Sequence, residues 1–407
     1  MKNVLPLFIF IDALGWEIIR DEPFAAFCAP RRRRLTSVFG YSSACVPSIV
    51  SGKWPSEHHN WCYFVYDPQR SPFRALRHLR WIPSTLSSRR KVRRQISKLV
   101  KRQIKFRGYF DLYNMPFRYI SKFDFSEKKS PLKPNGMNRG TNIFDYLEEH
   151  EIAYHSSDPD KSETENTAAL VEDIRKEQVD FAFVYWPELD GLLHVVGNRS
   201  PRIPEKLKAY QQRIEDILAL AQHHYSEVRL YIFGDHGMAN CNDFLDLRQQ
   251  VEGLGLTMFR DYAVVYDSTM ARFWFFNERA RAEVKRLLAG VPEGRILPDE
   301  ELKEMGTYFP DHRFGELIFL VKEGVLIVPS DMGQRPLRAM HGYHPTDKHS
   351  YAALCTNQAA IPESISAIPH MYDLMVQDAE YARERNRDLA DWPARYAVTA
   401  PAIAAAR

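Results

Sequence analysis

The chain has 407 residues, of which 45% are hydrophobic, 13% aromatic and 26% charged. This composition excludes a disordered or low-complexity protein and predicts one large domain with inserts, or two domains. The five cysteines are scattered and form no CxxC pair, which argues against a disulfide framework and a thiolate zinc site. We therefore expect a protein of a reducing compartment, the cytoplasm.

The net charge of +3 conceals a strong asymmetry along the chain. Residues 70–139 hold 20 Lys and Arg against three acidic residues, a local balance of +17, and the remainder carries −14. A basic block of this kind usually faces phosphates, an anionic membrane or an acidic partner.

The first predicted element is a buried strand at residues 4–11. It is rich in β-branched and aromatic residues and ends at Asp12. Nothing here approaches the roughly 20 apolar residues of a membrane span, and we see no small-residue cleavage site. We interpret the segment as the first strand of a sheet, not as a signal peptide or a transmembrane helix.

A serine-rich segment follows, with the sequence GYSSACVPSIVSGKWPSEHHNW. Ser42 and Ser43 precede a predicted short helix that ends near Gly52. The free N–H groups and the dipole of a helix N-terminus stabilise an anion, so a serine there can act as a nucleophile toward phosphorus. The alternative is that both serines only cap the helix.

The basic block contains a predicted amphipathic helix, because apolar residues recur at helical spacing between Val92 and Ile104. One interpretation is contact with an anionic membrane surface through residues 85–107, which would make the protein peripheral at the membrane. Another is binding of a phosphorylated small molecule or a lipid- or glycan-linked phosphate. A third is a solvated helix on an acidic body. We do not expect nucleic acid, since no recognisable module supports it.

Beyond the basic block, strands and helices alternate. Helices are predicted at residues 141–150, 164–177 and 204–224, and buried strands at 179–185 and 228–233. This alternation predicts an α/β fold with a doubly wound, mostly parallel sheet. Asp190 and Asp235 follow the two strands as Asp12 follows the first, and such carboxylates meet at one edge of the sheet.

Two inserts interrupt the α/β pattern. A small α+β cap is expected at residues 255–329, with a strand-like segment at 263–276, a helix at 278–290 and a hairpin at 315–329. Tyr266, Arg272 and Trp274 are cap residues that could contact a substrate by position alone. The predicted core comprises 1–69, 140–254 and 330–407, the basic helical insert 70–139, and the tail after Asp378 is expected to end in a peripheral helix or to fray.

Side chains of metal-ligand type recur in three of the later segments. YWPELDGLLH places Asp190 four residues before His194, YIFGDHGM places Asp235 beside His236, and MHGYHP supplies His341. Residues four apart on a helical turn can face one ion. Ligation by carboxylate and imidazole together is typical of zinc and less so of manganese.

Taken in order, these segments resemble the alkaline phosphatase superfamily, and most closely its nucleotide pyrophosphatase/phosphodiesterase branch, over roughly residues 4 to 345. In that superfamily the nucleophile stands ten residues before the glycine that closes its helix, which selects Ser42 here. The resemblance implies two divalent metal ions, normally zinc, with manganese as the alternative. It implies one ion held by Asp190, His194 and His341, and a second held by Asp12, Asp235 and His236, with Ser42 bridging toward it.

The implied function is cleavage of a phosphodiester or pyrophosphate bond through a phosphoseryl intermediate, with net retention after two inversions. One departure concerns substrate contact: the branch usually carries an asparagine at the position of Tyr63, so Tyr63 or the nearby Asn60 would donate to the phosphoryl oxygen instead. The alternatives are a phosphomonoesterase, a sulfatase-like hydrolase in view of the Cys45-Val46-Pro47-Ser48 segment, or a catalytically silent protein that binds anionic surfaces.

Overall fold

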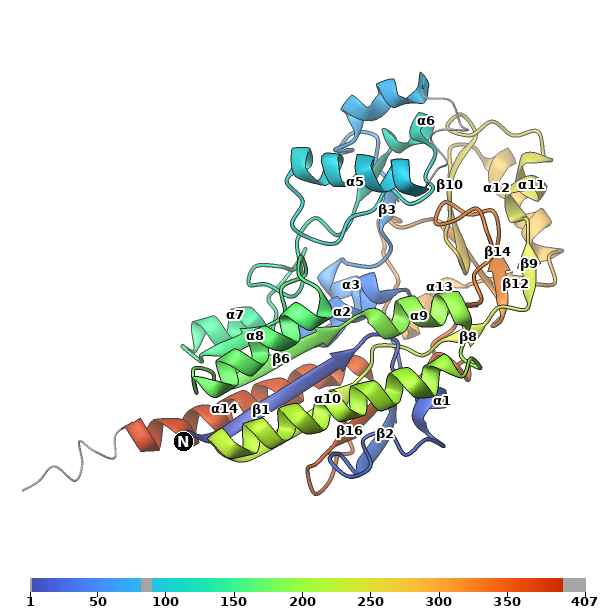
Figure 1. Ribbon diagram of the computed structural model, residues 1–407. Helices are drawn as coiled ribbons and strands as arrows, with labels where there is room; N and C mark the ends of the chain where they lie inside the picture. Colours follow the sequence, from blue (N-terminus) through green and yellow to red (C-terminus); the bar gives the residue numbers. More distant parts are fainter. Residues whose placement is uncertain (1, 82–89, 391–407) are drawn as a thin grey trace, which may run out of the picture.

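A six-stranded sheet forms the centre of the fold (Figure 1). The computed structural model describes residues 2–81 and 90–390. Across the sheet the strands follow the order β2-β16-β7-β1-β6-β5. Their bounds are β1 (Lys2–Ile11), β2 (Arg31–Leu35), β5 (Tyr154–Ser156), β6 (Phe181–Trp186), β7 (Tyr225–Phe233) and β16 (Ala352–Thr356).

The three strands predicted from apolar runs are β1, β6 and β7, and they lie side by side in the middle of the sheet. β1 pairs in parallel with both β6 and β7, and β5 extends the parallel ladder beyond β6. Their apolar residues are buried on both faces, as expected of strands covered by helices on two sides. The predicted α/β class is confirmed.

The sheet is mixed, however, because β16 runs antiparallel to both β7 and β2. The chain enters β16 from the edge at which the parallel strands end, where Gly237, just after β7, packs against the backbone of His349 and Tyr351. The chain between β7 and β16 thus returns to the edge that it left, and a strand that begins there runs antiparallel to β7.

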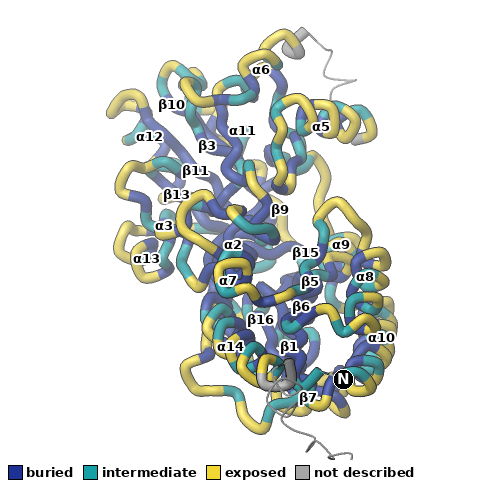
Figure 2. Tube along the Cα trace, turned by 90° about the vertical axis from the view of Figure 1, so that its left-hand side faces the viewer, coloured by how far each residue is buried: buried dark blue, intermediate teal, exposed yellow. Residues whose placement is uncertain are grey.

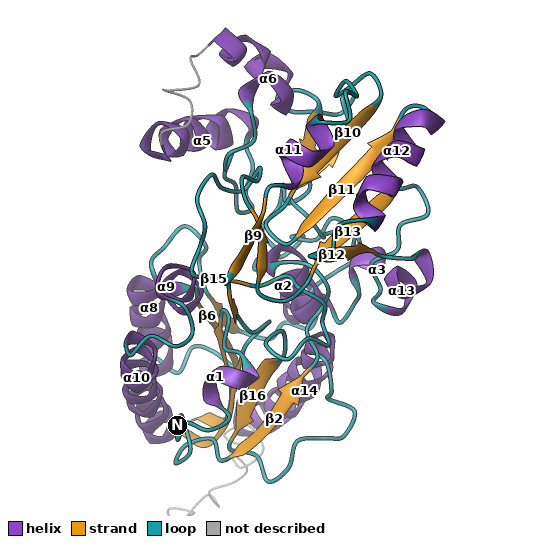
Figure 3. Cartoon of the chain, turned by 90° about the vertical axis from the view of Figure 1, so that its right-hand side faces the viewer, coloured by secondary structure: helices purple, strands orange, loops and turns teal. Residues whose placement is uncertain are grey.

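Helices cover both faces of the sheet (Figures 1 and 3). Three of them share a hydrophobic cluster with one face of β1, and three share a second cluster with its other face. The first group is α2 (Ser42–Ser51), α7 (Ile143–Glu149) and α14 (Met371–Ala390), and the second is α8 (Glu163–Arg175), α9 (Glu188–Val196) and α10 (Arg202–His224). The chain beyond α14, residues 391–407, lies outside the described residues, so the prediction for the end of the tail is not tested there.

A second, four-stranded antiparallel sheet stands beside the carboxyl-terminal edge of the first (Figure 1). Its order is β10-β11-β13-β12. The elements of this region are α11 (Leu247–Glu252), β10 (Tyr262–Tyr266), β11 (Met270–Phe275), α12 (Glu278–Ala289), β12 (Gly294–Ile296), α13 (Asp299–Glu304) and β13 (Leu317–Val321). The segment predicted as strand-like is therefore the hairpin β10–β11, and the predicted helix is α12.

The hairpin predicted at residues 315–329 is wrong. β13 pairs with β11 and β12, whereas the next strand, β14 (Val325–Ile327), pairs in parallel with β9 (Asp243–Leu245). The turn contains Gly324 at a φ of +89°, a conformation that glycine adopts without strain. Two apolar runs separated by a turn resemble a hairpin in sequence. In the fold, however, each run pairs with a different strand from elsewhere in the chain.

The remaining elements are short. They are α1 (Trp16–Ile19), α3 (Pro55–His58), α6 (Phe117–Ile120), the 3-10 turns η1 (Arg74–Trp81) and η2 (Ile368–His370), and the paired strands β3 (Phe64–Tyr66) with β4 (Phe123–Phe125) and β8 (Ala239–Asn240) with β15 (Ala339–Met340).

The predicted basic amphipathic helix is α5 (Arg90–Ile104). Its apolar side is turned into the protein, where Val100 is buried and Ile96 and Ile104 pack against the same cluster. Exposed positions recur along α5 between buried ones (Figure 2). Most of the apolar face of α5 is thus covered by protein, and Leu99 is its exposed exception. Within the predicted membrane-contact segment 85–107, residues 85–89 lie outside the described residues.

Among the described helices, none is long and apolar enough to cross a membrane.

The three cap residues singled out for substrate contact are buried instead. Tyr266, Arg272 and Trp274 are at most 6% exposed. The Nε of Arg272 donates to the Asp267 carboxylate at 2.7 Å, and its terminal nitrogens donate to the carbonyls of Phe314 and Phe64. Arg272 therefore joins the cap sheet to β3, and the expectation of substrate contact is corrected: packing between two sheets, which the sequence pattern does not report, encloses these side chains.

We predict that Arg272→Met lowers the free energy of unfolding by roughly 3 kcal/mol, because it leaves the Asp267 carboxylate buried without its partner. Urea denaturation of the variant and the wild type measures the difference. A second variant, Arg272→Met combined with Asp267→Asn, should recover much of the loss, since it removes both charges. Equal stability of the single variant and the wild type would show that the ion pair does not hold the two sheets together.

Candidate active site

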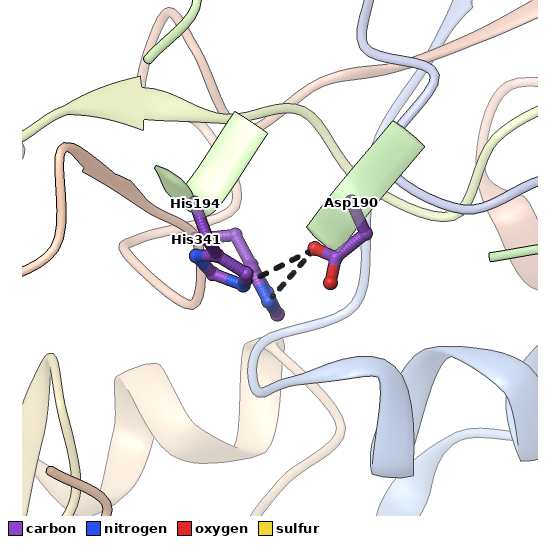
Figure 4. A group of neighbouring side chains, drawn as sticks. All are labelled: Asp190, His194 and His341. Carbon is purple, nitrogen blue, oxygen red and sulfur yellow. Dashed lines mark ion pairs between the residues drawn. The ribbon is translucent and has the colours of Figure 1, made fainter. Parts of the chain in front are cut away.

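Asp190, His194 and His341 form the first of two groups of metal-ligand type side chains. Asp190 and His194 stand four residues apart on α9, and His341 follows β15. Both histidines are directed at Asp190, with their Nε2 atoms 3.3 Å and 3.6 Å from its Oδ1 (Figure 4). One ligand atom from each of the three residues lies within 4.8 Å of the others.

Asp12, Asp235 and His236 form the second group. Asp12 directly follows β1, and Asp235 and His236 follow β7 after one glycine. Because β1 and β7 are paired in parallel, their ends bring the two segments together. The Nε2 of His236 lies 3.2 Å from Asp235 Oδ2 and 3.5 Å from Asp12 Oδ1.

The two groups are neighbours. The rings of His236 and His341 stack with their centroids 3.7 Å apart and an interplanar angle of 7°. The six residues predicted as ligands therefore lie together, and two ions bound there would act on the same substrate.

Backbone carbonyls orient two of the histidines. The Nδ1 of His194 lies 2.9 Å from the carbonyl oxygen of Ala339, and the Nδ1 of His236 lies 2.9 Å from that of Gly237. An Nδ1–H that donates to a carbonyl leaves Nε2 unprotonated and directed at the group. This is the arrangement in which a neutral imidazole binds a metal ion.

The two groups contain buried oxygen and nitrogen atoms without hydrogen-bond partners, which fits the binding of divalent cations. Asp12 Oδ1, Asp190 Oδ1, Asp235 Oδ2 and His341 Nδ1 are buried and have no hydrogen-bond partner. Burial and the neighbouring carboxylates of Asp235 and Asp190 raise the pKa of Asp12 well above its ordinary value. Burial likewise raises the pKa of Asp235 to about 7, with Asp190 adding to the effect. Carboxylates this crowded are stabilised by a cation between them.

Ser42 lies beside the second group, at the first helical position of α2. Its Oγ is 3.2 Å from His236 Nε2. The three other serines of α2 face elsewhere: Ser43 and Ser51 donate to the carbonyl oxygens of Trp61 and Pro47, and Ser48 pairs with the Nε2 of His58. The helix ends at Gly52 at a φ of +68°, as predicted. Of the four serines of α2, Ser42 is the one that the fold brings to the metal-ligand side chains.

Cys45, on which the sulfatase alternative depends, is fully buried within α2. Its thiol contacts the hydroxyl of Ser37 and the carbonyl oxygen of Val38. Burial raises the pKa of the thiol well above its usual range. A buried, neutral thiol is inert, so the geometry favours Cys45 as a core residue.

The two predicted substrate donors lie in different surroundings. Asn60 is buried, and its Oδ1 accepts from the backbone N–H of Asn138. Tyr63 stacks on Phe125 and lies beside Tyr109 and Tyr113. Burial raises the pKa of the Tyr63 phenol, and the neighbouring Glu127 adds to the effect. The roles of both residues toward substrate stay predictions.

Sequence reasoning missed two tyrosines that hold the site. Tyr185, on β6, donates to Asp12 Oδ2. The Tyr41 hydroxyl lies 2.9 Å from Thr269 Oγ1, Thr269 donates to the carbonyl oxygen of Gly342, and the Tyr41 ring meets the edge of His341. The only sequence signal for Tyr185 was its place one residue before the end of a strand beside Asp12. Nothing in the sequence linked Tyr41 to Thr269.

Glu127 lies behind the tyrosines and is almost fully buried. Its Oε1 accepts from the backbone N–H of Tyr109 at 3.2 Å. Burial raises its pKa to about 8, although Tyr109 and the charge of Lys101 oppose the effect. At neutral pH this carboxyl is therefore mostly protonated.

We predict that Glu127→Gln is more stable than the wild type above pH 5. The unfolded chain ionises this carboxyl above a pH of about 4.3, whereas the folded chain does so only near pH 8. The wild type accordingly loses stability as pH rises through this window, and the uncharged variant does not. The difference should grow to on the order of 4 kcal/mol by pH 8. Urea denaturation at pH 5, 6.5 and 8 measures it, with the exposed Glu363→Gln as control. A pH-independent difference contradicts the prediction.

Comparison with known proteins places these residues in context. Residues 7–344 match the family model described as type I phosphodiesterase / nucleotide pyrophosphatase. Among solved structures, human ectonucleotide pyrophosphatase/phosphodiesterase 5 aligns with a TM-score of 0.63 and 17% identity, covering 93% of this chain and 95% of that one. An inactive variant of the murine protein in complex with AMP aligns with a TM-score of 0.61 at the same identity and coverage.

Proposed function

Because the chain belongs to the type I phosphodiesterase / nucleotide pyrophosphatase family, we propose that it hydrolyses a phosphodiester or pyrophosphate bond with Ser42 as nucleophile. The observation that carries the proposal is the position of the Ser42 Oγ, at a helix N-terminus and 3.2 Å from His236 Nε2. The nucleophile of such a reaction needs a neighbouring group that favours its deprotonated form and a positive field for the phosphoryl oxygens.

The proposed reaction has two displacements at phosphorus. First, Ser42 Oγ attacks, the bond from phosphorus to the leaving oxygen breaks, and the serine proton is given up toward the leaving group or solvent. A phosphoseryl ester results. In the second displacement water attacks phosphorus, the bond to Ser42 Oγ breaks, and the serine regains a proton. Two inversions give net retention of configuration.

Two divalent ions are part of the proposal. Asp190, His194 and His341 would hold one, and Asp12, Asp235 and His236 the other, with Ser42 beside the second. Zinc suits this carboxylate and imidazole set best, and manganese is the alternative. Bound there, the ions supply Lewis acidity that lowers the pKa of the serine hydroxyl and offsets charge on the phosphoryl oxygens.

We propose a nucleotide as the substrate class, because the murine relative was solved with AMP. The N–H groups at the start of α2 would bind a phosphoryl oxygen, and the Tyr63 hydroxyl would donate to another. The unpaired state of all five cysteines supports a reducing compartment, the cytoplasm.

A phosphomonoesterase is the second candidate, and Tyr63 is the observation that favours it. The diesterase branch usually places an asparagine at this position, so the contact that selects diesters is altered here. A bulkier phenol at this point would leave less room for a second ester group.

Hydrolysis of bis-p-nitrophenyl phosphate and p-nitrophenyl phosphate, measured side by side on the zinc-loaded chain, tests the proposal. We expect chelator-sensitive cleavage of the diester, faster than that of the monoester. The reverse order supports the second candidate. If neither ester is cleaved by fully loaded protein, the proposed function is wrong.

A further inference from the structure

A groove of about 390 Å³ runs along the carboxyl-terminal half of α5. We call it the basic groove. It is lined by Lys98, Lys101, Arg102, Lys105, Phe106, Arg107 and Asp160. Five of these seven residues are cations and one is an acid. Asp160 belongs to the loop before α8, so the groove lies between the basic segment and that loop.

The cations of the basic groove are largely uncompensated. Lys101 lies 3.4 Å from Asp160. Within residues 2–81 and 90–390, no carboxylate lies within ion-pair distance of Lys98, Arg102, Lys105 or Arg107. Lys98 and Arg102 are four residues apart on α5, and like charges at this spacing on a helix repel. Lys105 and Arg107 follow the end of the helix and add two further cations. A bound anion would relieve that repulsion.

The helix that presents these cations is held rigidly. The buried guanidinium of Arg93 donates to the carbonyl oxygens of Tyr113 and Met115 at 2.8 and 3.0 Å. Ser97 donates to Asp111 and accepts from the backbone N–H of Leu112. These bonds tie α5 to the loop at 111–115. The basic side is thereby fixed outward, so a ligand meets a preorganised surface and loses less entropy on binding.

The same loop connects the groove to the site. Tyr109 and Tyr113 lie against Tyr63, with ring centroids 5.6 and 5.7 Å away. Tyr63 lies two residues after Trp61, whose carbonyl oxygen accepts from Ser43, the neighbour of Ser42. On the other side, residues 105–107 of the basic groove stand two to four residues before Tyr109. The aromatic contacts of Tyr63 therefore run from the nucleophile helix toward the basic groove.

We propose that the basic groove binds a second anionic group of the substrate, a phosphate remote from the one attacked by Ser42. This inference rests on the proposed function and narrows its substrate class to polyanionic phosphodiesters or pyrophosphates. Arginine and lysine are the side chains that bind phosphate most often. A membrane surface fits less well, because Ile96, Val100 and Ile104 of α5 are packed inside the protein and Leu99 alone of its described large apolar side chains is exposed.

Inorganic tripolyphosphate is the probe for the test, measured by calorimetry on the full-length, metal-loaded chain. The variant Arg102→Gln/Lys105→Gln removes two cations of the groove. The control Lys91→Gln/Arg94→Gln removes two exposed cations from the same helix outside the groove. Binding of the probe at the metal ions is common to all three proteins and cancels in the comparison.

We expect the groove variant to bind tripolyphosphate roughly tenfold more weakly and the control less than twofold more weakly, as two exposed ion pairs would give. The difference should shrink in high salt. Equal affinities in the two variants overturn the proposal. It is also overturned if the groove variant loses flotation with vesicles containing 30% phosphatidylserine while keeping its affinity for tripolyphosphate, since the surface would then be a membrane contact. If the wild type does not hydrolyse bis-p-nitrophenyl phosphate, the proposed function is contradicted, whereas the measured affinity for tripolyphosphate is unaffected.

Discussion

Replacing Ser42 by alanine is expected to lower kcat for bis-p-nitrophenyl phosphate by roughly 10⁴-fold, because no other hydroxyl of α2 reaches the metal-ligand groups. Ser43, Ser48 and Ser51 are engaged with Trp61, His58 and Pro47. The fold should not change, since Ser42 makes no capping bond to the α2 backbone. Steady-state kinetics and thermal unfolding measured on the same preparation separate the two effects.

The matched control is Ser43→Ala, one residue further along the same helix. Its hydroxyl donates to the carbonyl oxygen of Trp61, so the variant should lose about 1 kcal/mol of stability and keep most of its activity. If Ser43→Ala abolished hydrolysis and Ser42→Ala did not, the nucleophile would be misassigned. Trapping of labelled phosphate on the wild type at low pH, and its loss in Ser42→Ala, gives an independent check.

Replacing one carboxylate in either ligand group, in two separate variants, is expected to halve the metal content of each variant. It should also lower kcat roughly 10³-fold or more. Asp190→Asn should lose the ion of the first group, and Asp235→Asn that of the second, because an amide oxygen replaces a charged ligand. Elemental analysis of the purified variants measures the metal, and the chelator-treated wild type should match them in activity.

Asp216→Asn is the control for this pair, since Asp216 is exposed on α10 and far along the chain from either group. It should keep both ions and full activity. The wild type and both variants should share one near-UV circular dichroism spectrum, which guards against misfolding. Unchanged zinc content in both site variants would show that the ions, if bound, lie elsewhere.

Much of the site could be predicted because its spacing is local or set by a parallel sheet. Asp190 and His194 share one turn of helix, and Asp12 and Asp235 each stand just past the end of a strand in the same parallel ladder. The order of segments then suggested His341, which no local rule would place beside Asp190. For these residues short-range geometry and the rule for strand ends were sufficient.

The features that escaped prediction depend on contacts between distant segments. β14 pairs with β9, about 80 residues earlier in the chain, although its own sequence favours a hairpin with β13. Tyr41 meets Thr269 across 228 residues. The buried position of Arg272 follows from carbonyls on β3 and near Phe314. Contacts with distant residues produce no pattern in a single sequence. For this reason Arg272, a charged residue in a strand, was interpreted as a substrate contact.

The hydrophobic cluster beneath α5 limits how this chain can be shortened. Phe64 of β3, Phe73 and Val100 of the basic region, and Val265 and Trp274 of the cap sheet belong to the same cluster. A chain from which residues 70–139 were deleted would expose the apolar side of the cap hairpin and of β3 together, and exposed apolar patches of this kind promote aggregation. Truncation or graft designs therefore have to treat the basic segment and the cap as a single exchangeable unit.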